Sequence, residues 1–209
     1  KVTLSVDKKK LNEGESVSVQ IQLSGQSVCD VTVTLGLGGT AKEGIDYPLE
    51  KTIIIPSGSV RAVTEMTTID DAIFEGDETV IVEVESTGPC AVAAGVQKRS
   101  ITIIDNEPFP TVTLSVDRSV IPEKGGVVLV RAETKTRSTK EIKVNLAINK
   151  SSTAASTDVK LTGTTITIPA ESQSGSVTLT AVDDTLHELT ETVVIEVAGV
   201  THATESGSQ

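Results

Sequence analysis

An internal repeat constrains the fold of this chain more than any other feature of its sequence. Val2–Asp7, which reads VTLSVD, returns unchanged as Val112–Asp117. Thr79–Val84, which reads TVIVEV, is matched by Thr192–Val197, which reads TVVIEV. The period of about 110 residues has the size of one small sandwich domain and is far longer than a solenoid unit. The sequence therefore predicts two tandem domains of similar size.

The predicted limits of these domains follow from the segment that joins the repeats. The first domain is expected over residues 1–107 and the second over residues 111–209. Residues 108–110 read Pro-Phe-Pro, and two prolines around one aromatic residue leave little slack. We therefore predict a short, stiff linker between the domains.

Alternation of apolar and polar residues with a period of two dominates both repeats and is typical of half-buried β-strands. Val17, Val19 and Ile21 fall on one face in this way, and Gly and Pro residues punctuate the gaps between such runs. No helical period persists. The fold class is therefore predicted to be all-β, with two tandem seven-strand Greek-key (immunoglobulin-like) β-sandwiches. Strands are expected near 2–7, 16–23, 30–37, 51–56, 60–69, 79–86 and 99–105, and near 111–117, 127–134, 141–148, 164–169, 175–182 and 192–198.

The second repeat is one strand short of the first. After Val197 the sequence runs only to Gln209, where a counterpart of residues 99–105 would still be needed. Either that strand lies beyond residue 209 or another chain supplies it. As given, the second domain is expected to have an open sheet edge, which is a site for pairing with other copies.

The acidic segment from Asp70 to Glu78 also returns, as the segment from Asp183 to Glu191. Four carboxylates of the first copy are matched in kind and at identical spacing in the second. Like charges in a short loop are costly unless a cation neutralises them. Calcium, a hard ion that takes oxygen ligands, is the natural partner. A solvated acidic loop is the alternative, and two copies with the same spacing argue against it.

The topology of such a sandwich brings further acids to the same place. The first, third and fifth connections share one end with the close of the last strand. The candidate ligands in the first domain are Glu13, Asp46, Asp70, Asp71, Glu75, Glu78, Asp105, Asn106 and Glu107. Those in the second domain are Glu123, Asp158, Asp183, Asp184, Glu188 and Glu191.

So many ligands exceed the six to eight oxygens of one calcium ion, which predicts two or more ions in the first domain. The second domain lacks the closing acidic segment, so fewer or weaker ions are expected there. Magnesium fits less well because it requires strict octahedral geometry. Zinc is disfavoured because His187 and His202 have no recognisable ligand spacing.

Composition excludes several function classes. The formal net charge of −11 argues against nucleic acids and anionic membrane surfaces as partners, since both require basic patches. No apolar run is long enough to span a bilayer. We find no nucleophile–base pair and no glycine-rich phosphate loop, so an enzyme is not expected. The chain begins directly on a predicted strand without an initiator Met or signal peptide, and we interpret it as part of a larger protein.

Cys29 and Cys90 are the only cysteines, and both belong to the first repeat. They fall in two connections that lie at the same end of a Greek-key sandwich, so a disulfide is geometrically plausible. Such a bridge would place the protein in an oxidising compartment, whereas two unpaired thiols would suit a cytosolic protein. The sequon Asn149-Lys150-Ser151 adds weak support for an extracellular setting.

The first repeat resembles the Calx-beta domain of sodium–calcium exchangers and surface adhesins. The resemblance covers nearly the whole repeat and is carried by Gly39-Thr40-Ala41, Gly44-Ile45-Asp46-Tyr47, the segment from Ile69 to Thr79 and that from Ile101 to Glu107. It implies a seven-strand sandwich that binds calcium at one rim through the nine candidate ligands of the first domain named above. The second repeat resembles the family less, with Gly-Thr-Ala reduced to Ala154-Ala155 and the Phe position taken by His187.

The leading functional hypothesis is a calcium-binding tandem module of an extracellular or cell-surface adhesion or matrix protein. Calcium would rigidify the inter-domain joint, and the partners would be neighbouring domains of the same larger protein. The alternative is a cytosolic regulatory calcium sensor, as in an exchanger loop, which predicts no disulfide. An inert spacer or a glycan-binding module is a third possibility, and the near absence of Trp and Tyr speaks against a sugar-stacking surface.

Overall fold

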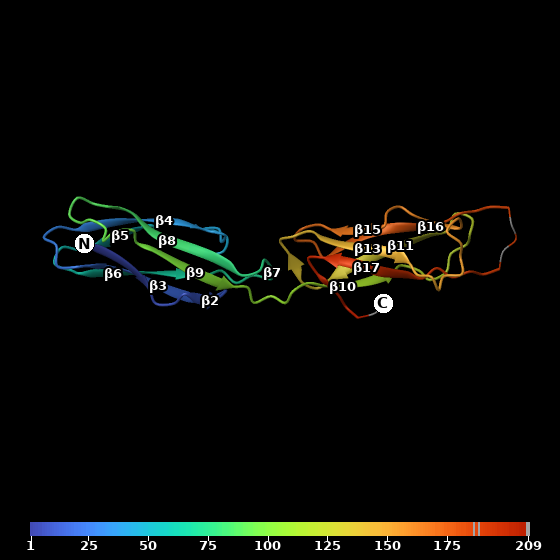
Figure 1. Ribbon diagram of the computed structural model, residues 1–209, viewed down its shortest axis with the longest axis horizontal. Helices are drawn as coiled ribbons and strands as arrows, with labels where there is room; N and C mark the ends of the chain where they lie inside the picture. Colours follow the sequence, from blue (N-terminus) through green and yellow to red (C-terminus); the bar gives the residue numbers. More distant parts are fainter. Residues whose placement is uncertain (186, 188, 208–209) are drawn as a thin grey trace. The chain divides into compact units, whose positions relative to one another are not determined.

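The computed structural model describes residues 1–185, 187 and 189–207, and every regular element in them is a β-strand (Figure 1). The chain divides into two compact units. The first comprises Lys1–Asp71 and Gly76–Asn106, and the second comprises Ala72–Glu75 and Glu107–Gln209. The all-β prediction is confirmed.

The first unit is a sandwich of two sheets. Its smaller sheet has the order β1-β3-β6 and its larger sheet the order β2-β9-β8-β4-β5. Neighbouring strands are antiparallel except for β2 and β9, which pair in parallel. In Figure 1, β4, β8 and β9 lie side by side in this unit. The strands are β1 (Val2–Val6), β2 (Lys10–Asn12), β3 (Ser16–Leu23), β4 (Val31–Gly39), β5 (Thr52–Ile55), β6 (Arg61–Thr67), β8 (Glu78–Thr87) and β9 (Lys98–Ile104).

The core of the first unit follows from the alternation in its strands. Val17, Val19 and Ile21 of β3 are at most 1% exposed, while the residues between them face outward. On the other sheet, Val80 of β8 lies opposite Ile101 of β9, and neither is exposed. Burial of such a side chain contributes roughly 1.5–3 kcal/mol. The core is mainly aliphatic, and Tyr47 and Met66 are also buried in it.

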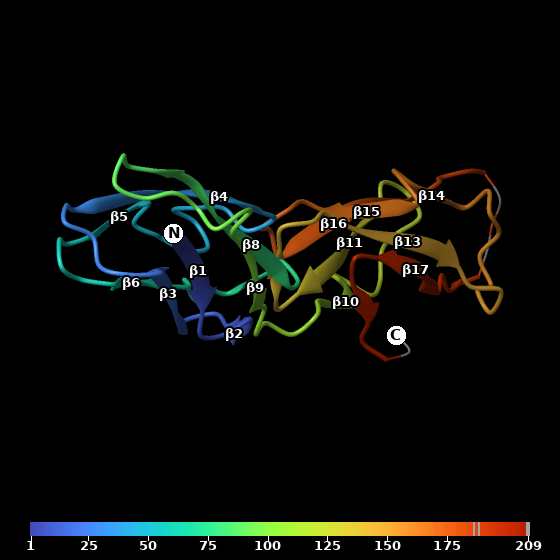
Figure 2. The same cartoon turned by 60° about the vertical axis from the view of Figure 1, so that its left-hand side comes forward.

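The second unit repeats the architecture with fewer long strands. Its sheets have the orders β14-β16-β11-β10-β18 and β15-β13-β17, and a parallel pair joins β12 to β7. Figure 2 shows β13 between β15 and β17. The strands are β7 (Ile73–Phe74), β10 (Thr111–Val116), β11 (Val127–Thr134), β12 (Arg137–Ser138), β13 (Ile142–Ile148), β14 (Val159–Leu161), β15 (Thr165–Ile168), β16 (Ser174–Ala181), β17 (Ile195–Thr201) and β18 (Thr204–Glu205).

The repeat extends to individual hydrogen bonds. The N–H of Thr79 donates to Thr40 Oγ1 at 2.9 Å, and the N–H of Thr192 donates to Thr153 Oγ1 at 2.8 Å. The reverse bonds, from Thr40 N–H to Thr79 O and from Thr153 N–H to Thr192 O, are both 2.9 Å. The counterpart of Thr40-Ala41 is therefore Thr153-Ala154, and our alignment of this element with Ala154-Ala155 was wrong by one residue.

The last long strand of the second unit departs from the sequence prediction. We expected a strand near 192–198, but β17 begins at Ile195 and ends at Thr201. In the first unit, residues 78–81 are held in β8 by pairing with β9. No strand pairs with the corresponding edge of the second unit among the residues that the structure describes, so residues 192–194 are not part of a ladder. The open edge predicted for this sheet is confirmed.

Five short strands escaped the sequence prediction because runs of two or three residues show no measurable alternation. They are β2, β7, β12, β14 and β18. Of these, β18 follows β17 and pairs in parallel with β10, where we had expected no strand.

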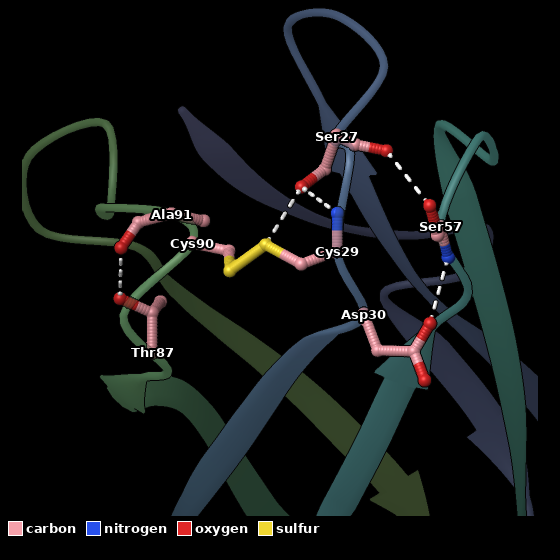
Figure 3. The surroundings of a disulfide bond; sticks show 7 residues. All are labelled: Ser27, Cys29, Asp30, Ser57, Thr87, Cys90 and Ala91. Carbon is pink, nitrogen blue, oxygen red and sulfur yellow. Dashed lines mark hydrogen bonds between the residues drawn. A yellow bond between two sulfur atoms is a disulfide. The ribbon is translucent and has the colours of Figure 1, made fainter.

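The disulfide prediction is confirmed: Cys29 and Cys90 form a bridge with a Cα–Cα distance of 6.4 Å. Cys29 lies between β3 and β4, and Cys90 lies between β8 and β9. Figure 3 shows the Cys29 N–H donating to Ser27 Oγ at 3.3 Å, and Asp30 Oδ1 accepting from the Ser57 N–H at 2.8 Å. The bridge thus ties two connections at one end of the first unit.

Candidate metal centre

Three carboxylates from distant parts of the sequence converge beside the end of β9. Ligand oxygens of Glu13, Asp105 and Glu107 all lie within 4.8 Å of one another. Glu13 lies between β2 and β3, whereas Asp105 and Glu107 follow the end of β9. All three residues are half-buried, and the Oε2 atoms of Glu13 and Glu107 are shielded from solvent.

The parallel pairing of β2 with β9 brings this first group together. Leu11 of β2 lies opposite Ile103 of β9, and Asn12 lies opposite Ile104. The ladder continues with a hydrogen bond of 3.2 Å from the Glu13 N–H to the Ile104 carbonyl. Glu13 is therefore carried to the end of β9 by backbone pairing, which does not depend on the charges themselves.

A second group consists of Asp46, Glu75 and Glu78, whose ligand oxygens also lie within 4.8 Å of one another. Asp46 sits in the β4–β5 connection and Glu78 opens β8. Two bonds fix Asp46: its Oδ2 accepts from the Lys42 N–H at 2.5 Å, and its carbonyl accepts from the Ile69 N–H at 2.8 Å. Burial, and then the negative charges of Glu43 and Asp46, raise the pKa of the neighbouring Tyr47.

Other candidate ligands connect the acidic segment to the end of β9. The Asn106 Nδ2 donates to Asp70 Oδ1 at 2.8 Å, and the Gly76 N–H donates to Asp105 Oδ2 at 2.5 Å. Asp70 and Asp71 are exposed and fall outside both groups of three. We name the nine candidate residues of the first repeat the acidic tip.

In the second unit the structure brings together Glu123, Asp158 and Glu191. Burial is the largest of the effects that raise the pKa of Glu191. The negative charge of Asp158, a side-chain hydrogen bond with Asp158 and the negative charge of Glu123 raise it further, in that order. Asp158 is fixed like Asp46, because its Oδ2 accepts from the Ala155 N–H at 2.6 Å and its carbonyl from the Val182 N–H at 2.8 Å.

The other three candidate ligands of the second unit are Asp183, Asp184 and Glu188. The Asp184 N–H donates to Glu123 Oε1 at 3.1 Å, whereas Asp183 forms an ion pair of 3.9 Å with Lys124. Glu188 lies outside the described residues. None of these residues belongs to a group of three carboxylates whose ligand oxygens lie within 4.8 Å of one another among the residues that the structure describes.

The donor chemistry of the acidic tip fits a hard divalent cation. Both groups offer only carboxylate oxygens and contain no His or Cys, which disfavours zinc. At about 4.8 Å and an effective dielectric constant of about 20, each pair of carboxylates repels by about 3 kcal/mol before screening by salt. A bound dication would convert this repulsion into attraction.

The sequence did not reveal that the acids divide into two groups, or that a backbone amide positions one of them. Gly76 has φ of +82°, a conformation that favours glycine. The only sequence signal for this role was the glycine inside the acidic segment.

No protein-family profile matches the sequence, and no curated protein matches it significantly. Among solved structures, the chain is similar to CBD12 from CALX1.2, with 16% identity, a TM-score of 0.44, and coverage of 87% of this chain and 76% of that one. It is similar to the calcium binding domain CBD12 of CALX1.1, with 13% identity, a TM-score of 0.44, and coverage of 96% and 80%. It is also similar to the apo-form Calx CBD1 domain, with 20% identity, a TM-score of 0.40, and coverage of 50% of this chain and 97% of that one. TM-scores below 0.5 do not establish a family, so the Calx-beta resemblance stays a prediction.

Proposed function

We propose that the chain is a calcium-binding tandem module and that the acidic tip is its main calcium site. The observation that carries this proposal is the convergence of Glu13 with Asp105 and Glu107 to within 4.8 Å. Half-buried carboxylates are costly to bring together, and calcium is the common cation that takes six to eight such oxygens in flexible geometry.

Two groups of three carboxylates support two ions in the acidic tip. Neither group alone supplies six oxygens unless its carboxylates bind in bidentate fashion, so nearby oxygens or water complete each shell. The second unit binds fewer or weaker ions, because Asp183 pairs with Lys124 and the end of β9 has no counterpart among its described residues.

The calcium site lies beside the linker along the chain. Glu107 directly precedes Pro108, and Asp105 is two residues further back. An ion held by these two residues and Glu13 immobilises the backbone that enters the linker. We propose that calcium stiffens the inter-domain joint in this way, as a tandem array in an adhesion or matrix protein would require.

The Cys29–Cys90 disulfide supports an extracellular or cell-surface setting, since such bonds persist in oxidising compartments. It disfavours the cytosolic calcium sensor, which is expected to keep both thiols reduced. We propose a binding function without catalysis, because the clustered acids already have a role as ligands. Among the described residues, no helix has the length and apolarity needed to cross a bilayer.

Calorimetric titration of the chain with calcium tests this proposal. Glu13→Gln keeps the shape of the side chain and removes its charge, and it is expected to weaken calcium binding at least tenfold. Glu85→Gln is the matched control, because Glu85 is an exposed residue of β8 outside both groups. Absence of heat from calcium binding in the unmodified chain, or equal affinities of the two variants, would contradict the proposal.

A further inference from the structure

Thr68 is a buried polar residue that directly follows β6, and only 3% of it is exposed. Its Oγ1 atom lies 3.1 Å from the carbonyl oxygen of Asn12 and 3.0 Å from that of Glu15. The hydroxyl has one hydrogen to donate, and both carbonyl oxygens are placed to accept it. The Thr68 side chain therefore bonds to the turn between β2 and β3.

This turn carries Glu13, which belongs to the first group of three carboxylates. Asn12 precedes Glu13 and Glu15 lies two residues after it, so the hydroxyl of Thr68 bonds to the turn on both sides of the acid. Two backbone bonds support the same arrangement: the Glu15 N–H donates to the Asn12 carbonyl at 3.2 Å, and the Thr68 N–H donates to the Glu15 carbonyl at 2.9 Å. Thr68 thus fixes the backbone from which the Glu13 carboxylate projects.

The charges of the acidic tip act against this position of Glu13. One of its carboxylate oxygens lies within 4.8 Å of an oxygen of Asp105 and of Glu107, and like charges at that distance repel. Without a cation, this repulsion favours a movement of the turn away from β9. A hydroxyl buried in the core resists the movement, because water cannot readily replace its hydrogen bond. A turn that is already in place also lowers the entropy cost of ion binding.

The second unit has an alanine at the matching position. Thr67 of β6 pairs with the first residue of β3, and Thr180 of β16 pairs with the first residue of β11. The next residues along the chain, Thr68 and Ala181, are therefore counterparts. Their backbone bonds agree, because the Ala181 N–H donates to the Gly126 carbonyl at 2.9 Å, as the Thr68 N–H does to its own turn. Ala181 has no hydroxyl with which to hold the turn further.

The placement of the acids differs between the units at this same turn. The counterpart of Glu13 is Glu123, which belongs to no group of three carboxylates within 4.8 Å in the part of the chain that the structure describes. Asp158, in contrast, is fixed by the same two kinds of bond as its counterpart Asp46. The loss of the hydroxyl therefore coincides with a looser set of acids at the turn that the hydroxyl would hold.

We propose that Thr68 is a positioning residue of the calcium site in the acidic tip. Its hydroxyl holds the turn so that the Glu13 carboxylate stays beside Asp105 before an ion binds. Thr68 is not itself a ligand, because its hydroxyl faces the carbonyls of the turn. This inference rests on the proposed function of the acidic tip, but the effect of Thr68 on the turn can be measured without calcium.

Calcium calorimetry on variants of the full chain tests the role of the hydroxyl. Thr68→Val removes it at similar volume and is expected to weaken calcium binding at least fivefold, whereas Thr68→Ser keeps it and should bind within twofold of the parent. Thr68→Ala, which reproduces the residue of the second unit, gives the same expectation as valine if valine does not fit. Thr67→Val is the matched control, because Thr67 is exposed and its Oγ1 bonds only to Ser16 Oγ, at 2.8 Å. Parent-like affinity of Thr68→Val, or equal losses for Thr68→Ser and Thr68→Val, would overturn the proposal.

Hydrogen exchange in excess chelator measures the turn itself. The amides of Glu13 and Glu15 are both donors in the structure, to the carbonyls of Ile104 and Asn12. Their exchange is expected to accelerate at least tenfold in Thr68→Val and to stay within twofold of the parent in Thr67→Val. Unchanged exchange in Thr68→Val would overturn the proposal whatever the calcium affinity. Accelerated exchange in Thr68→Val, with no heat of calcium binding in the parent, would support the hold of Thr68 on the turn and contradict the proposed function instead.

Discussion

The Oδ2 atom of Asp105 accepts a hydrogen bond of 2.5 Å from the backbone N–H of Gly76. This bond joins the acidic segment to the end of β9, and it involves one of the proposed calcium ligands. Gly76 can hold its N–H in this position because its φ of +82° costs glycine little. A backbone donor therefore helps to orient the carboxylate before any ion binds.

Gly76→Ala is expected to lower both stability and calcium affinity. A side chain in the left-handed conformation costs about 1–2 kcal/mol, and relief of that strain moves the N–H away from Asp105. Gly58→Ala is the matched control, since Gly58 has φ of +79° and, like Gly76, open space around an added Cβ. Denaturant unfolding should show similar losses for both variants, whereas calorimetry should show at least a threefold loss of calcium affinity only for Gly76→Ala. Equal affinities would show that the Gly76 amide does not orient Asp105.

Calcium is expected to raise the thermal midpoint of the first unit. Ligand at one hundred times its Kd adds about 2.7 kcal/mol to the folded state at one site, which corresponds to a rise of about 10 °C for a domain of this size. Scanning calorimetry with calcium, with magnesium and with excess chelator measures the effect. Magnesium should give a smaller shift because of its stricter geometry. Superimposable curves in calcium and chelator would remove the calcium mechanism.

Removal of the disulfide is expected to destabilise the first unit without affecting its metal site. Replacing both Cys29 and Cys90 by Ser frees a long loop in the unfolded chain, which costs about 2–4 kcal/mol. Calcium affinity of the folded variant should stay unchanged, because the bridge lies at the opposite end of the sandwich from Glu13. The two measurements are urea unfolding and calcium calorimetry. A variant as stable as the parent would show that the bridge does not form in solution.

The pKa of Asp117 predicts how the stability of the second unit depends on pH. Its Oδ1 accepts a hydrogen bond of 2.8 Å from the Leu129 N–H, and this bond, more than the nearby Arg118, lowers the pKa of Asp117 below its ordinary value of 3.8. A lowered pKa in the folded state contributes stability that is present above pH 3.8 and is lost as the pH falls through the folded value.

Asp117→Asn is therefore expected to be less stable than the parent between pH 5 and 8, and the difference should shrink below pH 3.8. Arg118→Gln should have the smaller effect, because the ion pair contributes less to the pKa than the backbone hydrogen bond. Urea unfolding at several pH values measures both differences. A stability difference for Asp117→Asn that does not change with pH would contradict this assignment.

The strands and the fold class could be predicted because the alternation of apolar and polar residues can be read from each segment separately. Val17, Val19 and Ile21 were assigned to one face from their spacing, and they are buried together. Strand limits depended on partners: β17 begins at Ile195 because the edge that would extend it has no strand among the described residues. The short strand β2 has no pattern of its own, yet its pairing with β9 carries Glu13 to Asp105.

The sequence by itself determined that the chain forms two copies of an aliphatic β-sandwich and that acids recur at matched positions, because period and spacing are local properties. Only the tertiary structure decided that Glu13 meets Asp105 and Glu107 while Asp46 meets Glu75 and Glu78. It also decided that β17 begins only at Ile195. Both outcomes depend on which strands lie next to one another, and that choice is set by burial and hydrogen bonding across the whole sandwich.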